Sequence, residues 1–252
     1  MNNVIGRKTK GQWDEVWSRD IRMRLPSSLN VSTKNLKRLM KAKVKPGMRV
    51  LEIGCAPGKM LAWMAKIMGV TVAGLDYSER GINLARKLFV SLEIKGDLRC
   101  EDVFCTTFSG GSFDFVYSVG VVEHFDDAAT IVRKHMNLLR SGGMALIVIP
   151  NYGGIYGLVQ RRLDHENLMT HNLNIMSCQA MVQLVPKDLT SHVCAYVAGR
   201  ISPWILNFDK KWPKVSKVLF YVINVIGLFQ PFDIKPFCPM IVLEITRNNG
   251  TA

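Results

Sequence analysis

The chain has 252 residues, of which 48% are hydrophobic and 21% charged, and this composition excludes a disordered or fibrous protein and suits one domain with its own core. The net charge of +13 is concentrated in residues 1–50, which carry 13 Lys and Arg against three acids. Such a segment can attract nucleic acid or an anionic membrane, or it can be a solvated helix face. The N-terminus lacks the apolar run of a secretory signal, so we expect a cytoplasmic protein.

The cysteines give no sign of a metal centre. They form no C-x-x-C pair and no Cys/His cluster at zinc-ligand spacing, so we expect reduced thiols and no bound metal. The six are Cys55, Cys100, Cys105, Cys178, Cys194 and Cys238.

Residues 1–45 predict a basic N-terminal helical segment, ahead of a main domain over 46–252. Trp13 and Trp17 lie four residues apart, and apolar residues recur at helical spacing before Pro46. We therefore expect two helices, each apolar on one side and basic on the other.

Strands and helices then alternate over residues 49–151. The strands are expected at 49–55, 70–77, 98–104, 113–120 and 142–151, and the helices at 59–68, 78–90 (with Ser78 as N-cap) and 126–140. Strands that are apolar almost throughout are typical of a parallel sheet covered by helices on both faces. The pattern predicts an α/β, Rossmann-like, doubly wound domain.

The regular alternation of strands and helices is lost in residues 152–235. We take these residues as the acceptor-side region, that is, the part of the domain that binds the substrate to be modified. We expect a Gly-rich connection containing two histidines, a short helix at 177–185, a strand at 192–201 and a long apolar helix at 212–229. The last strand, PMIVLEITR, is expected to return as a hairpin partner at one sheet edge.

The stretch VLEIGCAPGK (50–59) predicts a ligand site between a strand and a helix. Glycines in this context let the backbone approach a ligand, and Asp76 ends the next strand about 20 residues on, where an acid accepts hydrogen bonds from ribose hydroxyls. Glu52 and Pro57 argue against a pyrophosphate, because one is acidic and the other has no N–H to donate. An acid here suits a ligand with a positive end, such as S-adenosylmethionine.

Residues 49–151 resemble the class I S-adenosylmethionine-dependent methyltransferases, in particular the group that includes the ubiquinone-biosynthesis O-methyltransferases. The segments that carry the resemblance, in order, are VLEIGCAPGK, VAGLDYSERGINLAR, EDVF, FDFVYSVGVVEHFDD and LLRSGGMALIVIPN. The resemblance implies a seven-stranded sheet of order 3-2-1-4-5-7-6 with strand 7 antiparallel, and S-adenosylmethionine as the cofactor. Ala56 stands where a glycine is commoner in the family.

The resemblance also implies the cofactor-binding residues. Glu52 and the backbone of residues 54–58 are expected to bind the amino acid part, with Asp76 on the ribose and Asp102 and Val103 on the adenine. The full set is Glu52, Gly54, Cys55, Ala56, Gly58, Asp76, Tyr77, Asp102, Val103 and Ser118.

Methyl transfer to a hydroxyl needs a base, and histidine is the usual one. His124 follows the fourth strand beside Glu123, and His165 and His171 lie in the connection after the fifth strand, near Tyr152. These three histidines are the candidate catalytic residues. The competing interpretation is that Glu123 and His124 order a turn and that each of the other two is a surface or packing residue.

We therefore expect a methyltransferase acting on a small molecule at oxygen, with an isoprenoid-, lipid- or glycan-pathway acceptor. The runner-up is an RNA or protein methyltransferase that docks through the basic N-terminus, and a third hypothesis is a non-catalytic cofactor-binding scaffold. No [DNS]-P-P-[YFW] motif follows the fourth strand, which argues against methylation of a nucleic-acid base at its amino group.

Residues 210–232 allow two interpretations. The stretch 218–232 carries no charge, is preceded by lysines and Trp212, and is too short to span a bilayer. The helix it predicts is either a cap or lid over the acceptor pocket or a peripheral membrane contact at the inner membrane face.

Overall fold

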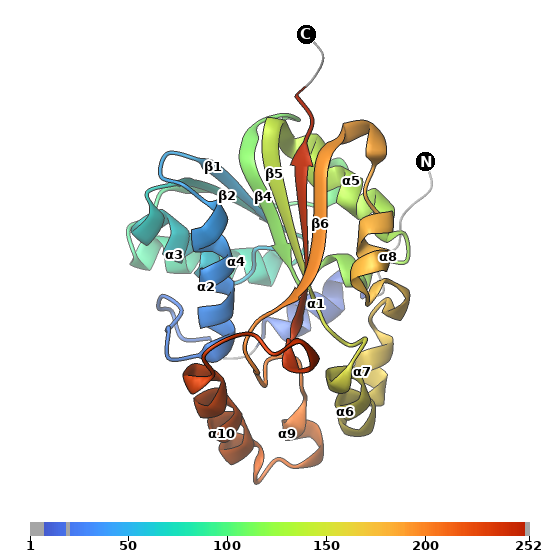
Figure 1. Ribbon diagram of the computed structural model, residues 1–252. Helices are drawn as coiled ribbons and strands as arrows, with labels where there is room; N and C mark the ends of the chain where they lie inside the picture. Colours follow the sequence, from blue (N-terminus) through green and yellow to red (C-terminus); the bar gives the residue numbers. More distant parts are fainter. Residues whose placement is uncertain (1–7, 19–20, 250–252) are drawn as a thin grey trace.

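The computed structural model describes residues 8–18 and 21–249, and its centre is a seven-stranded sheet with helices on both faces (Figure 1). The strands are β1 (Arg49–Ile53), β2 (Thr71–Asp76), β3 (Gly96–Cys100), β4 (Phe113–Val119), β5 (Leu139–Pro150), β6 (Thr190–Ala198) and β7 (Met240–Arg247). They are arranged in the order β3-β2-β1-β4-β5-β7-β6. The first five pair in parallel, whereas β7 is antiparallel to both β5 and β6. The predicted fold, strand order and antiparallel strand are confirmed.

The central strands are apolar throughout because both of their faces are covered. In β1, Val50 and Leu51 are fully buried although they point to opposite faces. One face packs against α2 (Val31–Lys43), α3 (Lys59–Met68) and α4 (Glu79–Ser91), and the other against α5 (Ala128–Leu138) and α8 (Cys178–Gln183). The central parallel strands therefore carry their charged groups near their ends, as Arg49 and Glu52 do in β1.

The N-terminal segment shares the core of the sheet. Val31 and Met40 of α2 have no exposed surface, and Met40 packs in the same cluster as Val50 of β1. The preceding helix α1 (Lys10–Val16) has no buried residue. The two parts, 1–45 and 46–252, are packed together in one core. The predicted boundary between them therefore stays a prediction.

Two stretches differ from the sequence expectation. The expected strand 98–104 is β3 (Gly96–Cys100) followed by the short 3-10 helix η1 (Val103–Cys105), since the Asp102 carboxylate accepts a hydrogen bond from the Phe104 N–H at 2.9 Å and so starts a turn. The Gly-rich connection contains two helices, α6 (Ile155–Leu163) and α7 (His165–Met169). Gly157 allows the first of them, because a Cβ there would lie 2.0 Å from the Tyr152 carbonyl oxygen.

The last part of the chain inserts two helices between β6 and β7. These are α9 (Phe208–Lys211) and α10 (Ser216–Phe229), and the remaining short 3-10 helices are η2 (Val122–His124), η3 (Leu173–Ile175), η4 (Lys187–Leu189) and η5 (Lys235–Phe237). Among the described residues, no helix combines the length and apolarity needed to cross a bilayer.

We expect replacement of Gly58 by alanine to destabilise the protein. Gly58 has φ +80°, and a Cβ there would lie 2.8 Å from the Ala85 Cβ of α4. An alanine at this positive φ would be strained, and its Cβ would clash with Ala85. Together these effects should lower the free energy of unfolding by about 1–3 kcal/mol. Urea denaturation of Gly58→Ala measures this loss. Gly11→Ala is the matched control, because a Cβ at this helical position meets nothing within 4 Å; equal stability of the two variants would contradict the argument.

Candidate active site

A cavity of about 760 Å³ lies at the carboxyl ends of β1, β2 and β4. Its walls include Gly54 and Asp76 on one side and Glu123, His124 and His171 on the other. Parallel strands end at the same edge of a sheet, so residues that are far apart in the sequence meet there. The cavity brings together the two groups that the sequence analysis assigned to cofactor and acceptor.

Asp76 fixes the loop after β1 to the end of β2. Its carboxylate accepts hydrogen bonds from the N–H groups of Ala56 at 3.0 Å and Ser78 at 2.8 Å. Burial raises the pKa of Asp76, and these two hydrogen bonds oppose that shift. The carboxylate is only 8% exposed and is held at the cavity wall.

Six predicted cofactor residues line the cavity: Gly54, Ala56, Asp76, Tyr77, Asp102 and Val103. Gly54 must be a glycine, since its φ is +74° and a Cβ would lie 2.4 Å from the Val121 side chain. The backbone of the loop can approach a ligand here because no side chain intervenes.

The other four predicted cofactor residues do not line the cavity, and their role stays a prediction. Ser118 is fully buried, and its Oγ lies 2.9 Å from the His135 Nε2. Cys55 is buried in the core cluster on the α3 side of the sheet, and Gly58 begins α3 against α4. Glu52 lies buried beneath the loop.

The buried carboxyl of Glu52 suits a ligand with a positive group. Its Oε2 has no hydrogen-bond partner, and the same holds for the neighbouring Tyr117 hydroxyl. Burial raises the pKa of Glu52 to about 8. An ammonium or sulfonium bound nearby would favour the ionised carboxylate, so the residues present fit S-adenosylmethionine.

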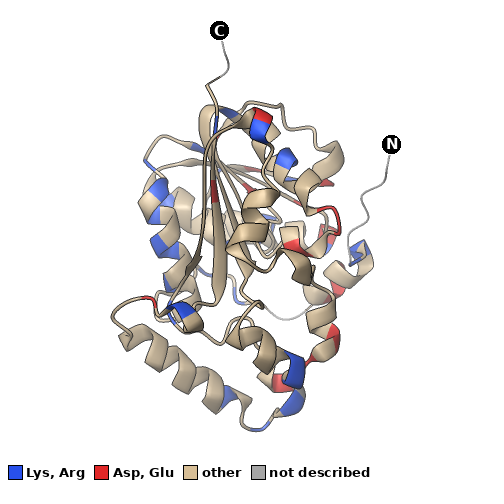
Figure 2. Ribbon diagram, turned by 45° about the vertical axis from the view of Figure 1, so that its right-hand side comes forward, with Lys and Arg blue, Asp and Glu red and all other residues tan. Residues whose placement is uncertain are grey.

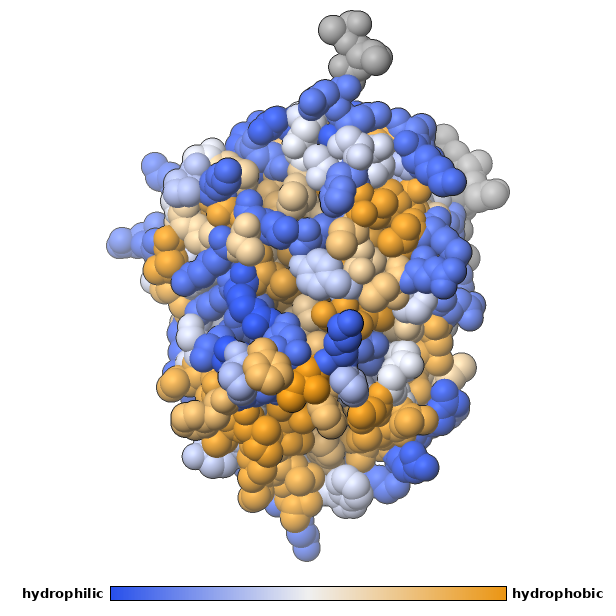
Figure 3. Space-filling view, viewed as in Figure 1, coloured by the Kyte–Doolittle hydropathy of each residue, from blue (hydrophilic) through white to orange (hydrophobic). Residues whose placement is uncertain are grey.

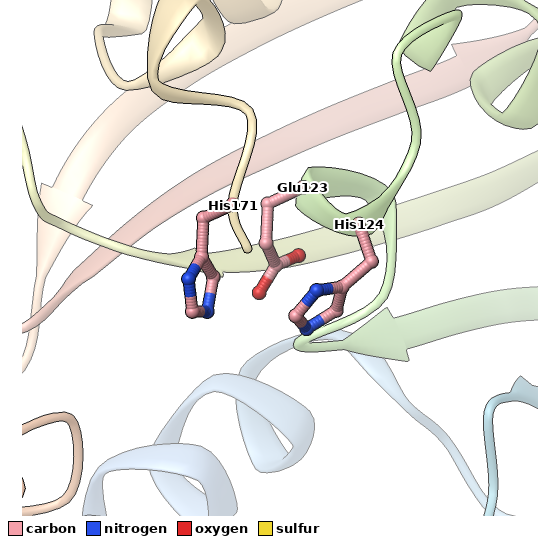
Figure 4. Close-up of side chains that lie close together, drawn as sticks. All are labelled: Glu123, His124 and His171. Atoms are coloured by element: carbon pink, nitrogen blue, oxygen red, sulfur yellow. The ribbon is translucent and has the colours of Figure 1, made fainter. Parts of the chain in front are cut away.

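On the acceptor side, Glu123, His124 and His171 converge (Figure 4). Glu123 and His124 belong to η2, and His171 follows α7; the two imidazole rings lie 4.7 Å apart. The Asn172 N–H donates to the Glu123 carbonyl oxygen at 2.6 Å, which ties the α7 segment to the end of β4. These three residues are called the Glu123 cluster below.

Backbone carbonyls favour one tautomer of each neutral imidazole. His124 Nδ1 lies 3.2 Å from the Thr170 carbonyl oxygen, and His171 Nδ1 lies 2.9 Å from that of Asn167. A carbonyl can only accept, so each neutral ring carries its proton on Nδ1 and has Nε2 as an acceptor. Both rings are thus in the tautomer that a general base needs.

Burial favours the protonated, neutral form of the Glu123 carboxyl. It is 1% exposed, its Oε2 has no hydrogen-bond partner, and burial raises its pKa to about 8, with Lys8 opposing the shift. Donor atoms of the Glu123 cluster lie within 4.8 Å of one another, close enough for one cation to contact all three. The expectation of no metal stays a prediction.

His165 begins α7, is exposed and does not line the cavity. Tyr152 does line it, where its hydroxyl donates to the Ile205 carbonyl oxygen at 2.7 Å and its ring lies 5.1 Å from that of His171. Of the three candidate histidines, the fold therefore brings His124 and His171 together and leaves His165 outside.

Helix α1 supplies a wall of the cavity that the sequence analysis did not assign. Trp13 and Trp17 line the cavity, and the Trp13 ring lies 5.0 Å from that of His124. The helix is anchored to α4, because the Asp14 carboxylate accepts hydrogen bonds from the Ser78 hydroxyl at 2.5 Å and the Arg80 N–H at 3.2 Å. In the sequence, only the four-residue spacing of the two tryptophans indicated that this helix presents an aromatic side.

Residues 51–147 match the family model described as "Methyltransferase domain". The match covers the glycine loop, Asp76, Asp102 and the Glu123–His124 pair. This match agrees with the resemblance of residues 49–151 to the class I S-adenosylmethionine-dependent methyltransferases.

Curated relatives of the methyltransferase domain differ in the atom they methylate. A ubiquinone biosynthesis O-methyltransferase from Sinorhizobium medicae is 34% identical over 105 residues, which are 42% of this chain and 42% of that protein. Phosphoethanolamine N-methyltransferase 1 from Arabidopsis thaliana is 33% identical over 109 residues, 42% of this chain and 22% of that protein. The matched stretch thus spans less than half the length of these relatives.

Solved structures share the fold of the methyltransferase domain. Phosphoethanolamine N-methyltransferase 2 from Haemonchus contortus, in complex with phosphomonomethylethanolamine and S-adenosylhomocysteine, aligns with a TM-score of 0.59 at 17% identity, over 87% of this chain and 53% of that chain. A structure concerned with conversion of a disulfide bond into a thioacetal group in echinomycin biosynthesis aligns with a TM-score of 0.61 at 17% identity, over 96% and 94%.

We expect Asp76→Ala to weaken binding of S-adenosylmethionine at least tenfold, because a ligand ribose would lose its acceptor and the loop its anchor at the Ala56 N–H. Isothermal titration calorimetry measures the affinity. Asp97→Ala is the control, since this exposed residue of β3 pairs with Arg99 and lies outside the cavity. Unchanged binding by Asp76→Ala would refute the assignment.

We expect stability to fall as the pH rises from about 4.5 to 8. Glu52 and Glu123 have folded-state pKa values of about 8, above their ordinary value, so the folded state binds more protons than the unfolded state in this window. Each group contributes a slope of at most about 1.4 kcal/mol per pH unit. Urea denaturation at pH 5.5 and pH 8 should show a smaller difference for Glu123→Gln than for the wild type, whereas the exposed control Glu93→Gln should keep the full difference.

Proposed function

We propose that the protein transfers a methyl group from S-adenosylmethionine to an oxygen atom of a small, partly apolar acceptor. The observation that carries the proposal is the cavity that joins the loop at Gly54 and Asp76 to the Glu123 cluster. S-adenosylmethionine supplies an electrophilic methyl group on a sulfonium. The chain must then hold the acceptor in line with that methyl and take the proton from the acceptor oxygen.

The cofactor side of the cavity offers a partner for each part of S-adenosylmethionine. Asp76 is an acceptor for ribose hydroxyls, while Asp102 and Val103 stand at the wall where the adenine is expected. Glu52, beneath the loop, provides a buried negative charge for the amino end of the ligand once it is ionised. Four of the predicted positions, Cys55, Gly58, Ser118 and Glu52, would act without lining the cavity.

His124 or His171 takes the proton from the acceptor hydroxyl on Nε2, while Nδ1–H is held by a backbone carbonyl. As the oxygen forms its bond to the methyl carbon, the carbon–sulfur bond breaks and the electron pair stays on sulfur. The buried Glu123 carboxyl lies against the imidazolium that results and stabilises its charge when ionised. His165 has no part in this scheme because it lies outside the cavity.

The acceptor should be apolar in part. Beyond Tyr152 the cavity wall continues through Trp204 and Ile205. An isoprenoid- or lipid-linked compound fits such a wall better than a sugar does. The relatives include both O- and N-methyltransferases, and a buried base favours oxygen, because a hydroxyl must lose its proton whereas a neutral amine can attack directly.

The RNA or protein alternative loses part of its support in the structure. Several basic side chains of α2 are engaged within the chain: Lys37 donates to the Pro26 carbonyl oxygen at 2.6 Å, and Lys43 pairs with Glu244 at 2.6 Å. They contribute less to a free docking surface than their number in the sequence suggests. A cytoplasmic location stays a prediction.

We expect at least one of the variants His124→Ala and His171→Ala to lower methyl transfer by a factor of about 10² or more, because a positioned base contributes 10²–10⁴. The assay follows labelled methyl from S-adenosylmethionine into products of a cell extract, separated by solvent extraction. Cofactor affinity should change by less than about threefold.

His165→Ala serves as the control and should keep full activity. Full activity in both cluster variants would contradict the proposed base. Treatment with EDTA leaves activity intact if the cluster works without a metal; loss on EDTA that Mg²⁺ or Zn²⁺ restores would show that the cluster holds a cation. A labelled product that ribonuclease removes would favour the RNA alternative.

A further inference from the structure

Helix α10 attaches to the protein through an inner apolar flank and through small and polar residues. Asn224 accepts a hydrogen bond from the Val31 N–H at 2.8 Å and donates one to the Leu29 carbonyl oxygen at 2.9 Å, so it caps α2 from outside. At Gly227 the two chains approach so closely that a Cβ would lie 2.1 Å from the Ile201 carbonyl oxygen. Only Ser216 and Gly227 of this helix are buried. The position of α10 is therefore fixed by specific contacts.

The outer side of α10 is apolar and exposed. Val218, Tyr221, Val222, Ile226 and Phe229 recur at helical spacing, with exposed fractions of 62%, 70%, 45%, 52% and 84%, and Phe232 continues the line at 66%. These six residues are called the apolar stripe below. Figure 3 shows the hydrophobic surface gathering over this part of the molecule. A surface helix of a globular protein normally turns such a stripe inward.

The apolar stripe is flanked by positive charge. Lys211, Lys214 and Lys217 precede it and Lys235 follows it, and all four are exposed. The sequence has no acid from residue 210 to 232. The nearest acid beyond the stripe, Asp233, pairs with Arg38 at 2.5 Å, while Asp209 is exposed on α9. Figure 2 shows α10 free of acidic residues along its length.

We propose that the apolar stripe docks on the surface of an anionic lipid bilayer. The helix has 14 residues and lies in the plane of the interface, with its stripe among the upper acyl chains and the lysines on the phosphates. Trp212, 45% exposed at the start of the segment, sits at the level of the headgroups. The lysine flanks favour a bilayer over a protein partner, because anionic headgroups complement them along the whole segment.

The docked face is next to the wall of the cavity. Ile205 lines the cavity and packs in one cluster with Leu219, Phe220 and Ile223, which form the inner apolar flank of α10. Trp204 lines the cavity as well and is 38% exposed. A lipid-linked acceptor would enter the cavity from the bilayer on this side. This last step rests on the proposed function, whereas docking itself does not.

Flotation of the full chain with vesicles tests the docking. Vesicles of phosphatidylcholine with 30% phosphatidylglycerol should bind the wild type at low salt, and Val218→Asp/Phe229→Asp should reduce the bound fraction at least tenfold. Both side chains are exposed, so the fold should tolerate the change. The control Ile67→Asp/Val90→Asp adds the same charge at exposed apolar positions on α3 and α4 and should bind as the wild type does.

The lysine flank is tested by charge reversal. Lys214→Glu/Lys217→Glu should weaken binding by more than an order of magnitude, since each lysine at an anionic surface contributes about a fivefold effect. The matched control Lys87→Glu/Lys95→Glu changes exposed lysines elsewhere and should have little effect. Vesicles of phosphatidylcholine alone should bind the wild type weakly.

Two results would overturn the docking. One is a wild type that stays unbound on anionic vesicles at low salt or binds no better than Val218→Asp/Phe229→Asp. The other is a chain that self-associates through the stripe, seen in sedimentation as a dimer that this double variant converts to monomers. Binding of S-adenosylmethionine, measured on the same variants, should be unchanged. Vesicle binding requires no methyl transfer, so failure of the docking is distinguishable from failure of the proposed reaction.

Discussion

The structure depends on how three buried carboxyl groups are accommodated at one edge of an apolar sheet. Asp76 ends β2, Glu52 lies in β1 and Glu123 follows β4, and none is more than 8% exposed. A buried carboxylate needs hydrogen bonds, a positive partner or a proton. Asp76 has the first, from two backbone N–H groups, whereas Glu52 and Glu123 each retain an oxygen without a partner. Glu123 lines the cavity, where it can respond to a bound ligand or to proton transfer, whereas Glu52 lies buried beneath the loop that lines it.

The two ends of the cavity are stabilised by different means. At the cofactor end the loop is held by backbone geometry, with a glycine at φ +74° and an anchored carboxylate. At the acceptor end a segment from after β5 is brought back by the Asn172 N–H bond to Glu123, and it is His171 on this segment that completes the cluster. The end of the cavity at Gly54 and Asp76 is therefore shaped within one strand–loop–helix unit. The end at the Glu123 cluster forms only when distant segments of the chain meet in the fold.

This contrast explains what could be predicted from the sequence. Fold, strand order and cofactor loop followed from local patterns and from the family resemblance, because the relevant residues are close in the sequence and have a fixed spacing. The pairing of His124 with His171 could not follow from spacing, since 46 residues with two unpredicted helices separate them. The glycines that suggested a loose connection, Gly157 above all, instead permit α6 to approach the Tyr152 carbonyl. Exposure is equally non-local: the apolar run 218–232 is the same sequence whether it is buried or faces outward. Which side faces outward is decided by the contacts of Asn224 with residues 29 and 31 and of Gly227 with Ile201.

Helix α1 gives the cavity a wall made from residues near the beginning of the sequence, while β7 runs antiparallel to its neighbours and carries Arg247 to the far edge of the sheet. The two ends of the described chain are therefore unequal as attachment points. A fluorophore attached to the side chain of Lys8, which lines the cavity, would lie beside the Glu123 cluster, whereas one attached at Arg247 would lie outside the cavity. For immobilised or labelled forms of this protein, attachment near the end of β7 therefore leaves the cavity undisturbed.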